Sequence, residues 1–177
     1  IEPPLPSVSV HNMLRSGSLG IETLLAPEAA LAALNGLFQM DDQDGHFFTI
    51  WYGVYQTSTR TLRYATAGAP PALAIHLADD GDVTLTELST PAEPIGMFDD
   101  TEFTSNTYTV PPGDRILIFS DGAWELGLSE GKSLSFAEFT ELNTRLAASS
   151  SWSLDGLVKE LKTLTPTGVF ADDCSLI

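Results

Sequence analysis

The stretch Arg115-Ile-Leu-Ile-Phe-Ser-Asp-Gly122 carries the clearest structural signal in this sequence, a strand followed by a turn. Its four consecutive large apolar residues, 116–119, predict a buried strand, and an Asp-Gly pair follows where that strand ends. An acidic side chain in this place is held rigidly, and glycine lets a metal ion or ligand approach closely. Asp-Gly is also among the commonest turn dipeptides, so Asp121 and Gly122 alone indicate only a turn.

We call Asp121-Gly122 and Asp172-Asp173 the two acidic pairs, and the second of them precedes a short apolar stretch near the end of the sequence. Successive residues of a strand face opposite sides, so only one of the two carboxylates is expected to enter a given site. Carboxylate oxygens are hard ligands that suit Mg²⁺ or Mn²⁺. The alternative is a solvated turn, and spacing along the sequence does not show whether the two acidic pairs meet.

Outward from this stretch, apolar and β-branched residues separated by short polar turns predict further strands. The predicted strands span residues 47–55, 61–67, 72–77, 83–88, 104–110 and 115–119, with another beginning in 174–177. Helical spacing predicts helices through 10–14 and 27–38, and two more after the N-cap residues Ser135 and Ser153. Short connections favour antiparallel hairpins, so the order of elements indicates an α+β fold with helices flanking antiparallel sheet.

The charge balance excludes several classes of partner. Among the 177 residues, 8 lysines and arginines stand against 24 aspartates and glutamates, a net charge of −16. Nucleic acids and anionic membranes require clustered cations, so neither is expected as a partner. No apolar run reaches the roughly 20 residues of a membrane-spanning helix, and no signal peptide opens the chain. The 43% hydrophobic content predicts a folded globular domain, and these observations together lead us to expect a cytoplasmic protein.

Other reactive residue types carry no clear site. The single cysteine, Cys174, excludes an internal disulfide framework and a cysteine-based zinc site, and an inert core thiol is expected. His11, His46 and His76 are isolated and are expected to be ordinary surface or half-buried residues. The acidic run 41–45 lacks the ligands that a calcium-binding loop needs at its first and last positions.

Five segments of the sequence carry a more specific pattern. They are Phe47-Phe-Thr-Ile-Trp-Tyr-Gly-Val-Tyr55, Leu62-Arg-Tyr-Ala-Thr-Ala-Gly-Ala-Pro-Pro-Ala-Leu73, Pro94-Ile-Gly-Met-Phe98, Tyr108-Thr-Val-Pro-Pro-Gly-Asp-Arg-Ile-Leu-Ile-Phe-Ser-Asp-Gly-Ala-Trp-Glu125 and Ala171-Asp-Asp-Cys-Ser-Leu-Ile177. In this order they resemble motifs of the SpoIIE/RsbU-type bacterial phosphatases of the type 2C protein phosphatase superfamily. Each segment is a weak match alone, whereas five in order over nearly the whole chain are specific.

The resemblance implies a single SpoIIE-type phosphatase domain over residues 1–177, incomplete at both ends. It implies an antiparallel β-sandwich flanked by helices in α-β-β-α layers, with two Mn²⁺ or Mg²⁺ ions at one end. Asp121 and Asp172 match metal-ligand positions of the family. Asp173 is the less favoured neighbour, and Gly122 contributes its backbone to the metal site. No catalytic residue is expected beyond the metal ligands.

The activity that the resemblance implies is hydrolysis of phosphoserine or phosphothreonine on a bacterial regulatory protein, such as an anti-sigma-factor antagonist. Two metal ions lower the pKa of a shared water, and the resulting hydroxide attacks phosphorus in line. Bound cations also invert the local field of an acidic protein that would otherwise repel a phosphorylated substrate. An N-terminal sensor or receiver domain is implied as well.

The sequence departs from the family pattern in three places. The family has an aspartate in a Gly-Asp-x-x-Gly-His-Gly run that bridges the metals, and Ile1 is expected to follow directly after that run. Ala69 stands where the family has a histidine. Pro3, Pro4 and Pro6 lie where a family helix starts, and Pro6 is expected to disturb the interior of that helix.

Two other interpretations stay open at the level of the sequence. One is a catalytically degenerate phosphatase fold that acts as a protein-binding module in signalling. The other is an acidic α+β domain in which Asp121-Gly122 and Asp172-Asp173 are merely turns. Retention of both Asp121 and Asp172 favours the enzyme, because a site without a chemical task need not keep them.

Overall fold

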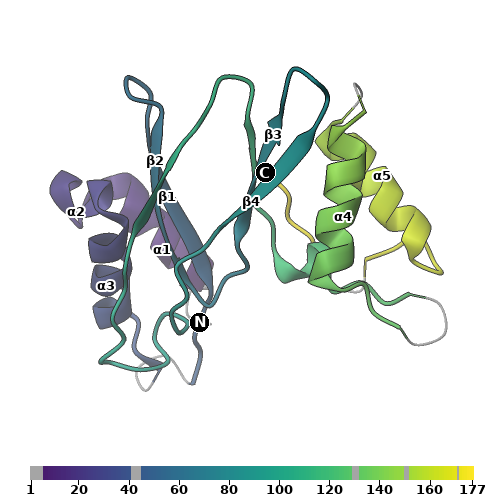
Figure 1. Cartoon of the computed structure of the whole chain (residues 1–177). Helices are drawn as coiled ribbons and strands as arrows, with labels where there is room; N and C mark the ends of the chain where they lie inside the picture. Colours follow the sequence, from purple (N-terminus) through teal and green to yellow (C-terminus); the bar gives the residue numbers. More distant parts are fainter. Residues whose placement is uncertain (1–5, 41–44, 129–131, 150–151, 171) are drawn as a thin grey trace. The chain divides into compact units, whose positions relative to one another are not determined.

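The chain folds into two compact units, each built from two separate segments of the sequence (Figure 1). The computed structural model describes residues 6–40, 45–128, 132–149, 152–170 and 172–177. The first unit combines Ile1–Ala69 with Ser89–Val110, and the second combines Pro70–Leu88 with Pro111–Ile177. Within the described ranges, every helix is too short or too polar to cross a membrane.

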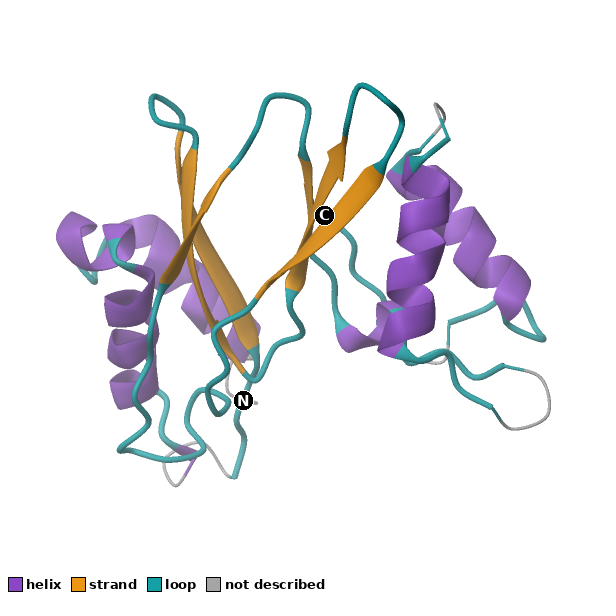
Figure 2. Ribbon diagram, in the orientation of Figure 1, coloured by secondary structure: helices purple, strands orange, loops and turns teal. Residues whose placement is uncertain are grey.

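In its described residues, the first unit has three α-helices and one three-stranded sheet (Figure 2). Its elements are α1 (Pro6–Ser16), α2 (Ile21–Leu25), α3 (Pro27–Leu37), β1 (Ile50–Gln56), β2 (Thr61–Ala67) and β5 (Asn106–Thr109). The strands lie in the order β1-β2-β5, and both pairings are antiparallel. The β1–β2 pairing is a hairpin, as the short connection between these strands predicts.

The core of the first unit lies between α3 and β2. Leu31 and Leu34 are fully buried one helical turn apart on α3, and they pack with Ala65 and Ala67 of β2. The buried side chain of Asn35 also ties α3 to the loop 95–98: its Oδ1 accepts a hydrogen bond from the Gly96 amide (2.7 Å) and its Nδ2 donates to the Phe98 carbonyl oxygen (2.9 Å). Each polar group of this side chain is therefore satisfied inside the unit.

The second unit contains the other sheet and the last two helices. Its elements are β3 (Ala72–Leu77), β4 (Val83–Leu88), β6 (Arg115–Leu117), α4 (Phe136–Ala147) and α5 (Leu154–Leu164). The strands lie in the order β4-β3-β6, again antiparallel. Just beyond β6, Ile118 exchanges two backbone hydrogen bonds with Ile177 (3.0 and 2.9 Å), so the last residues of the chain extend this sheet.

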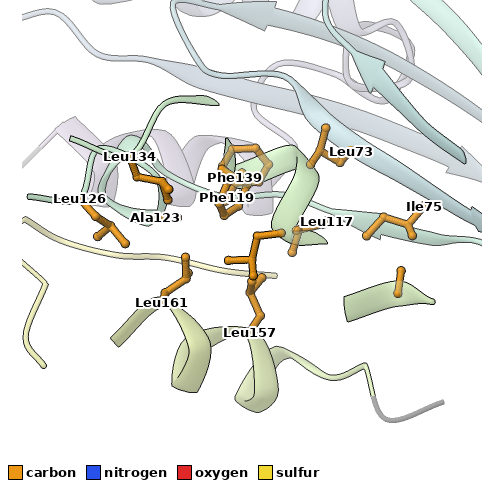
Figure 3. Packing of buried hydrophobic residues seen from close by; sticks show 12 residues of the cluster. Leu73, Ile75, Leu117, Phe119, Ala123, Leu126, Leu134, Phe139, Leu157 and Leu161 are labelled. Carbon is orange, nitrogen blue, oxygen red and sulfur yellow. The ribbon is translucent and has the colours of Figure 1, made fainter. Parts of the chain in front are cut away.

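Aromatic and leucine side chains fill the core of the second unit (Figure 3). The ring centroids of Phe119 and Phe139 lie 4.8 Å apart, which joins the segment that follows β6 to α4. Leu157 and Leu161 are fully buried one turn apart on α5 and point from that helix into the same cluster. The segment that leads to Asp121 is therefore anchored in a packed interior.

Most predicted elements are present, with differences at their ends. The bounds of β2, β3 and β4 agree with prediction, whereas β1 begins only at Ile50, because Phe48 bridges to Ile95 instead of joining the β1–β2 ladder. The short helix α2 was not predicted. The expectation that Pro6 disturbs a helix interior is wrong, because α1 begins at Pro6, and proline is tolerated in the first turn. Pro3 and Pro4 lie outside the described residues, as does most of the acidic run 41–45.

We expect Ser135→Ala to lower the free energy of unfolding by about 1 kcal/mol, because it removes the N-cap of α4. The Ser135 hydroxyl accepts a hydrogen bond from the Glu138 amide (3.3 Å), and the Glu138 carboxylate accepts one from the Ser135 amide (2.8 Å). Urea denaturation measures the change. Ser133→Ala, an exposed position two residues earlier, serves as the control; equal stability of the two variants would contradict the prediction.

Candidate metal centre

Asp121 opens a single turn of 3₁₀ helix directly after the buried strand segment. Its carbonyl oxygen accepts hydrogen bonds from the amides of Trp124 (2.9 Å) and Glu125 (2.8 Å), which fixes the turn. Its side-chain Oδ1 accepts from the Gly122 amide (2.9 Å), and the residue is exposed. The carboxylate therefore lies in a hydrogen-bonded turn just after the strand segment, where it is accessible to solvent.

The end of the chain returns alongside this turn. The Ser120 amide donates to the Ser175 carbonyl oxygen (3.1 Å), continuing the pairing that begins at Ile118 and Ile177. The Ser120 hydroxyl donates to the Asp173 carbonyl oxygen (3.0 Å) and accepts from the Ser175 amide (3.0 Å). These bonds join the segment before Asp121 to the segment that contains the second acidic pair.

Gly122 lies directly against the second acidic pair. It is buried, and a Cβ atom at this position would overlap the Asp173 carbonyl oxygen, 3.0 Å from the Asp173 carbonyl carbon and 3.4 Å from that of Asp172. Only glycine leaves space for this approach. The structure thus answers the question that the sequence left open, because the backbones of the two acidic pairs are in contact.

The acidic side chains of the two pairs face solvent without a cationic partner. Asp121, Asp172 and Asp173 are exposed, and within the described ranges none of them forms an ion pair. The Asp172 Oδ1 accepts a hydrogen bond from the neighbouring Asp173 amide (2.7 Å). Uncompensated carboxylates with hard oxygen atoms are suitable ligands for Mg²⁺ or Mn²⁺.

The donor set is nevertheless partial. Over the part of the chain that the structure describes, no three side chains of His, Cys, Asp or Glu gather closely enough to hold a metal ion. Asp121 and Asp172 fit a divalent cation in charge and ligand type, and further ligands are needed to complete its coordination. The resemblance had assigned one such ligand to an aspartate upstream of Ile1.

Cys174 lies next to the second acidic pair and is partly buried. Burial raises the pKa of its thiol, and the ammonium group of Lys162 opposes this effect only in part. The thiol is therefore protonated at neutral pH, as expected for an unreactive cysteine.

Two contacts in this unit were not predicted from the sequence. One is the bridge made by the Ser120 hydroxyl, which is described above. The other is a hydrogen bond of 2.6 Å between His76 Nδ1 and the fully buried carboxylate of Asp114. His76 is therefore not isolated, contrary to expectation. In the antiparallel β3–β6 pairing, His76 follows Ile75 and Asp114 precedes its partner Arg115, so His76 and Asp114 lie opposite each other.

Comparison with known proteins identifies the family. The profile of the family described as Stage II sporulation protein E (SpoIIE) matches residues 5–177. The phosphoserine phosphatase RsbP of Bacillus subtilis is 30% identical over 71% of this chain, and RsbU of the same organism is 25% identical over 79%. The chain spans 30% of the length of RsbP and 40% of that of RsbU.

Solved structures show the same fold. The RsbU and RsbW domains of Rv1364c from Mycobacterium tuberculosis match 97% of this chain with 26% identity and a TM-score of 0.70, over 45% of that protein. The SiaA-PP2C domain of Pseudomonas aeruginosa matches 97% with 17% identity and a TM-score of 0.70, over 67% of its length. RsbX in complex with magnesium matches 97% with 12% identity and a TM-score of 0.62, over 70% of its length.

These matches confirm both the resemblance and the predicted fold class. The antiparallel sheets and flanking helices of the two units are those of an α+β protein, and the solved neighbours include PP2C domains. The family profile extends over almost the whole sequence and includes both acidic pairs. This chain belongs to the SpoIIE family and has the fold of the PP2C-type phosphatases.

Proposed function

We propose that this chain contains the metal-binding part of a phosphatase that hydrolyses phosphoserine or phosphothreonine on a regulatory protein. The observation that carries the proposal is the contact between buried Gly122 and the Asp172-Asp173 backbone, which brings the exposed residues Asp121, Asp172 and Asp173 to one end of the partly buried strand segment 115–119. The relatives RsbP and RsbU are both phosphoserine phosphatases, which supports the same class of reaction here.

Asp121 and Asp172 are the residues that would hold the divalent cations, with Asp173 as the less favoured neighbour. Two Mn²⁺ or Mg²⁺ ions are expected, since the donors are carboxylates and the similar RsbX structure contains magnesium. When bound, such ions supply an activated water and offset the charge of the phosphate. The residues of this chain orient the ions, and Gly122 keeps the two acidic pairs together.

The net charge of −16 gives a second reason to expect a metal. A phosphorylated protein is repelled by an acidic surface, so cations at Asp121 and Asp172 are needed to reverse the local potential. We expect the substrate to be a phosphorylated cytoplasmic regulator, such as an anti-sigma-factor antagonist. A sensor or receiver domain elsewhere in the protein would control the reaction.

Hydrolysis of an aryl phosphate by the intact protein tests this proposal. Turnover is expected with Mn²⁺, and it should disappear with a chelator and return when Mn²⁺ is added in excess. A phosphoserine peptide and a phosphotyrosine peptide, compared under the same conditions, test the substrate class. Turnover that is indifferent to the chelator, or that is confined to the phosphotyrosine peptide, would overturn the proposal.

A catalytically inactive phosphatase fold that binds a signalling partner is the second candidate. The alanine at position 69, where the family has a histidine, favours it. In that case the intact protein would bind a phosphorylated regulator without releasing phosphate at any Mn²⁺ concentration. The same assay, with phosphate release and binding measured side by side, separates the two candidates.

Asp172→Asn is expected to weaken Mn²⁺ activation more than Asp173→Asn does. Asp172 lies in a bend and matches the ligand position of the family, with Asp173 as the less favoured neighbour. We expect the Mn²⁺ concentration for half-maximal turnover to rise about tenfold or more with Asp172→Asn. Equal effects of the two variants, or a larger effect of Asp173→Asn, would contradict the assignment.

A further inference from the structure

We propose that Ser120 is a positioning residue that holds Asp172-Asp173 next to Asp121-Gly122, an inference that rests on the function proposed above. Ser120 immediately precedes Asp121, and its side chain reaches the backbone of Asp173, which is 53 residues away in the sequence. It is therefore the residue through which the turn carrying Asp121 and the segment carrying Asp172 and Asp173 are joined by hydrogen bonds.

The hydrogen-bond pattern shows why a side chain is needed at this point. The antiparallel pairing of the last residues runs from Ile118 and Ile177 to Ser120 and Ser175, where the Ser120 amide donates to the Ser175 carbonyl oxygen (3.1 Å). Regular pairing would next require the Ser175 amide to donate to the Ser120 carbonyl oxygen. That oxygen instead accepts from the Ala123 amide (3.0 Å) and so closes the turn that begins at Asp121.

The Ser120 hydroxyl takes the place of the missing backbone acceptor. It accepts from the Ser175 amide (3.0 Å) and at the same time donates to the Asp173 carbonyl oxygen (3.0 Å). One residue thus closes the Asp121 turn with its carbonyl group and holds the second acidic pair with its hydroxyl group. No other side-chain hydrogen bond between the two segments is found among the described residues.

Loss of the hydroxyl would leave the Asp173 carbonyl and the Ser175 amide without their partners. The Asp172-Asp173 backbone lies in close contact with Gly122. Without the hydrogen bonds to Ser120, the segment that carries Asp172 and Asp173 would move away from Asp121. Divalent-cation sites respond strongly to such shifts, because groups that orient the ligands typically contribute 10- to 100-fold in metal affinity. The effect should therefore be seen in cation binding itself, in the absence of any substrate.

The test measures Mn²⁺ binding by calorimetry in the intact protein, together with hydrogen exchange of the Ser175 amide. Ser120→Ala is expected to weaken Mn²⁺ binding by about tenfold or more and to speed exchange at Ser175. Ser120→Thr keeps the hydroxyl and should restore both properties. Ser175→Ala is the matched control, since the exposed Ser175 contributes only backbone groups to the described bonds and both readouts should stay unchanged.

The outcomes distinguish this proposal from the proposed function. If wild-type protein binds Mn²⁺ and Ser120→Ala binds it equally well despite faster exchange at Ser175, the hydroxyl is only a structural contact and this proposal is overturned. If wild-type protein does not bind Mn²⁺, both proposals fail. Should Ser120→Ala not fold, Ser120→Cys has a similar shape but is a weak donor, and wild-type Mn²⁺ affinity in that variant would also overturn the proposal.

Discussion

Asp121→Asn is expected to abolish Mn²⁺-dependent hydrolysis while leaving the fold intact. The asparagine side chain has the same shape, and its carbonyl oxygen can still accept the hydrogen bond that Oδ1 receives from the Gly122 amide. The change replaces one carboxylate oxygen by an NH2 group that cannot bind a cation, and it removes the negative charge that attracts the cation. Loss of a group that only orients a metal ligand can cost about 100-fold in activity. Because Asp121 is itself a proposed ligand, we expect its substitution to lower turnover by more than this.

Aryl phosphate turnover at saturating Mn²⁺, together with thermal unfolding, checks this prediction. Asp79→Asn is the matched control, because Asp79 is an exposed residue of the same unit and its substitution makes an equal change in net charge. Turnover should be lost in Asp121→Asn alone, at an unchanged unfolding temperature. An Asp121→Asn protein that hydrolyses substrate at the wild-type rate would remove Asp121 from the site.

The strands could be predicted closely where the signals are local. The strands β2, β3 and β4 have the predicted bounds, because apolar and β-branched runs with short polar connections define them without reference to the rest of the chain; the turn 79–82, for example, separates β3 from β4. The helix α2 could not be predicted in this way. It has five residues, which are too few to establish a helical repeat, and none of them is buried.

The candidate site could be predicted only in part. The sequence supplies Asp121 and Asp172 through their motifs, but their proximity depends on contacts between segments about fifty residues apart. The Ser120 hydroxyl and the absence of a side chain at Gly122 create that proximity, and neither has a periodic signature. The glycine was expected to admit a ligand, whereas the structure shows that the group it admits is the backbone of the second acidic pair.

Gly122→Ala is expected to disrupt the site without removing any ligand. The added Cβ would overlap the Asp173 carbonyl oxygen, which cannot move aside freely because it accepts the Ser120 hydroxyl. The φ angle of Gly122 is outside the left-handed region, so the contact alone would cause the effect. Overpacking of this kind typically costs about 1–3 kcal/mol, and relief of it must separate the two acidic pairs.

Urea denaturation and Mn²⁺-dependent turnover together check this prediction, with Gly127→Ala as the matched control. Gly127 belongs to the same unit, and a Cβ there has no neighbouring atom within 4 Å. The control should therefore stay within about 0.5 kcal/mol of wild type and keep its activity. Because Gly122→Ala retains every carboxylate, a loss of turnover in this variant alone would tie activity to the contact between the two pairs. Equal behaviour of both variants would show that the contact is dispensable and that each aspartate acts independently of it.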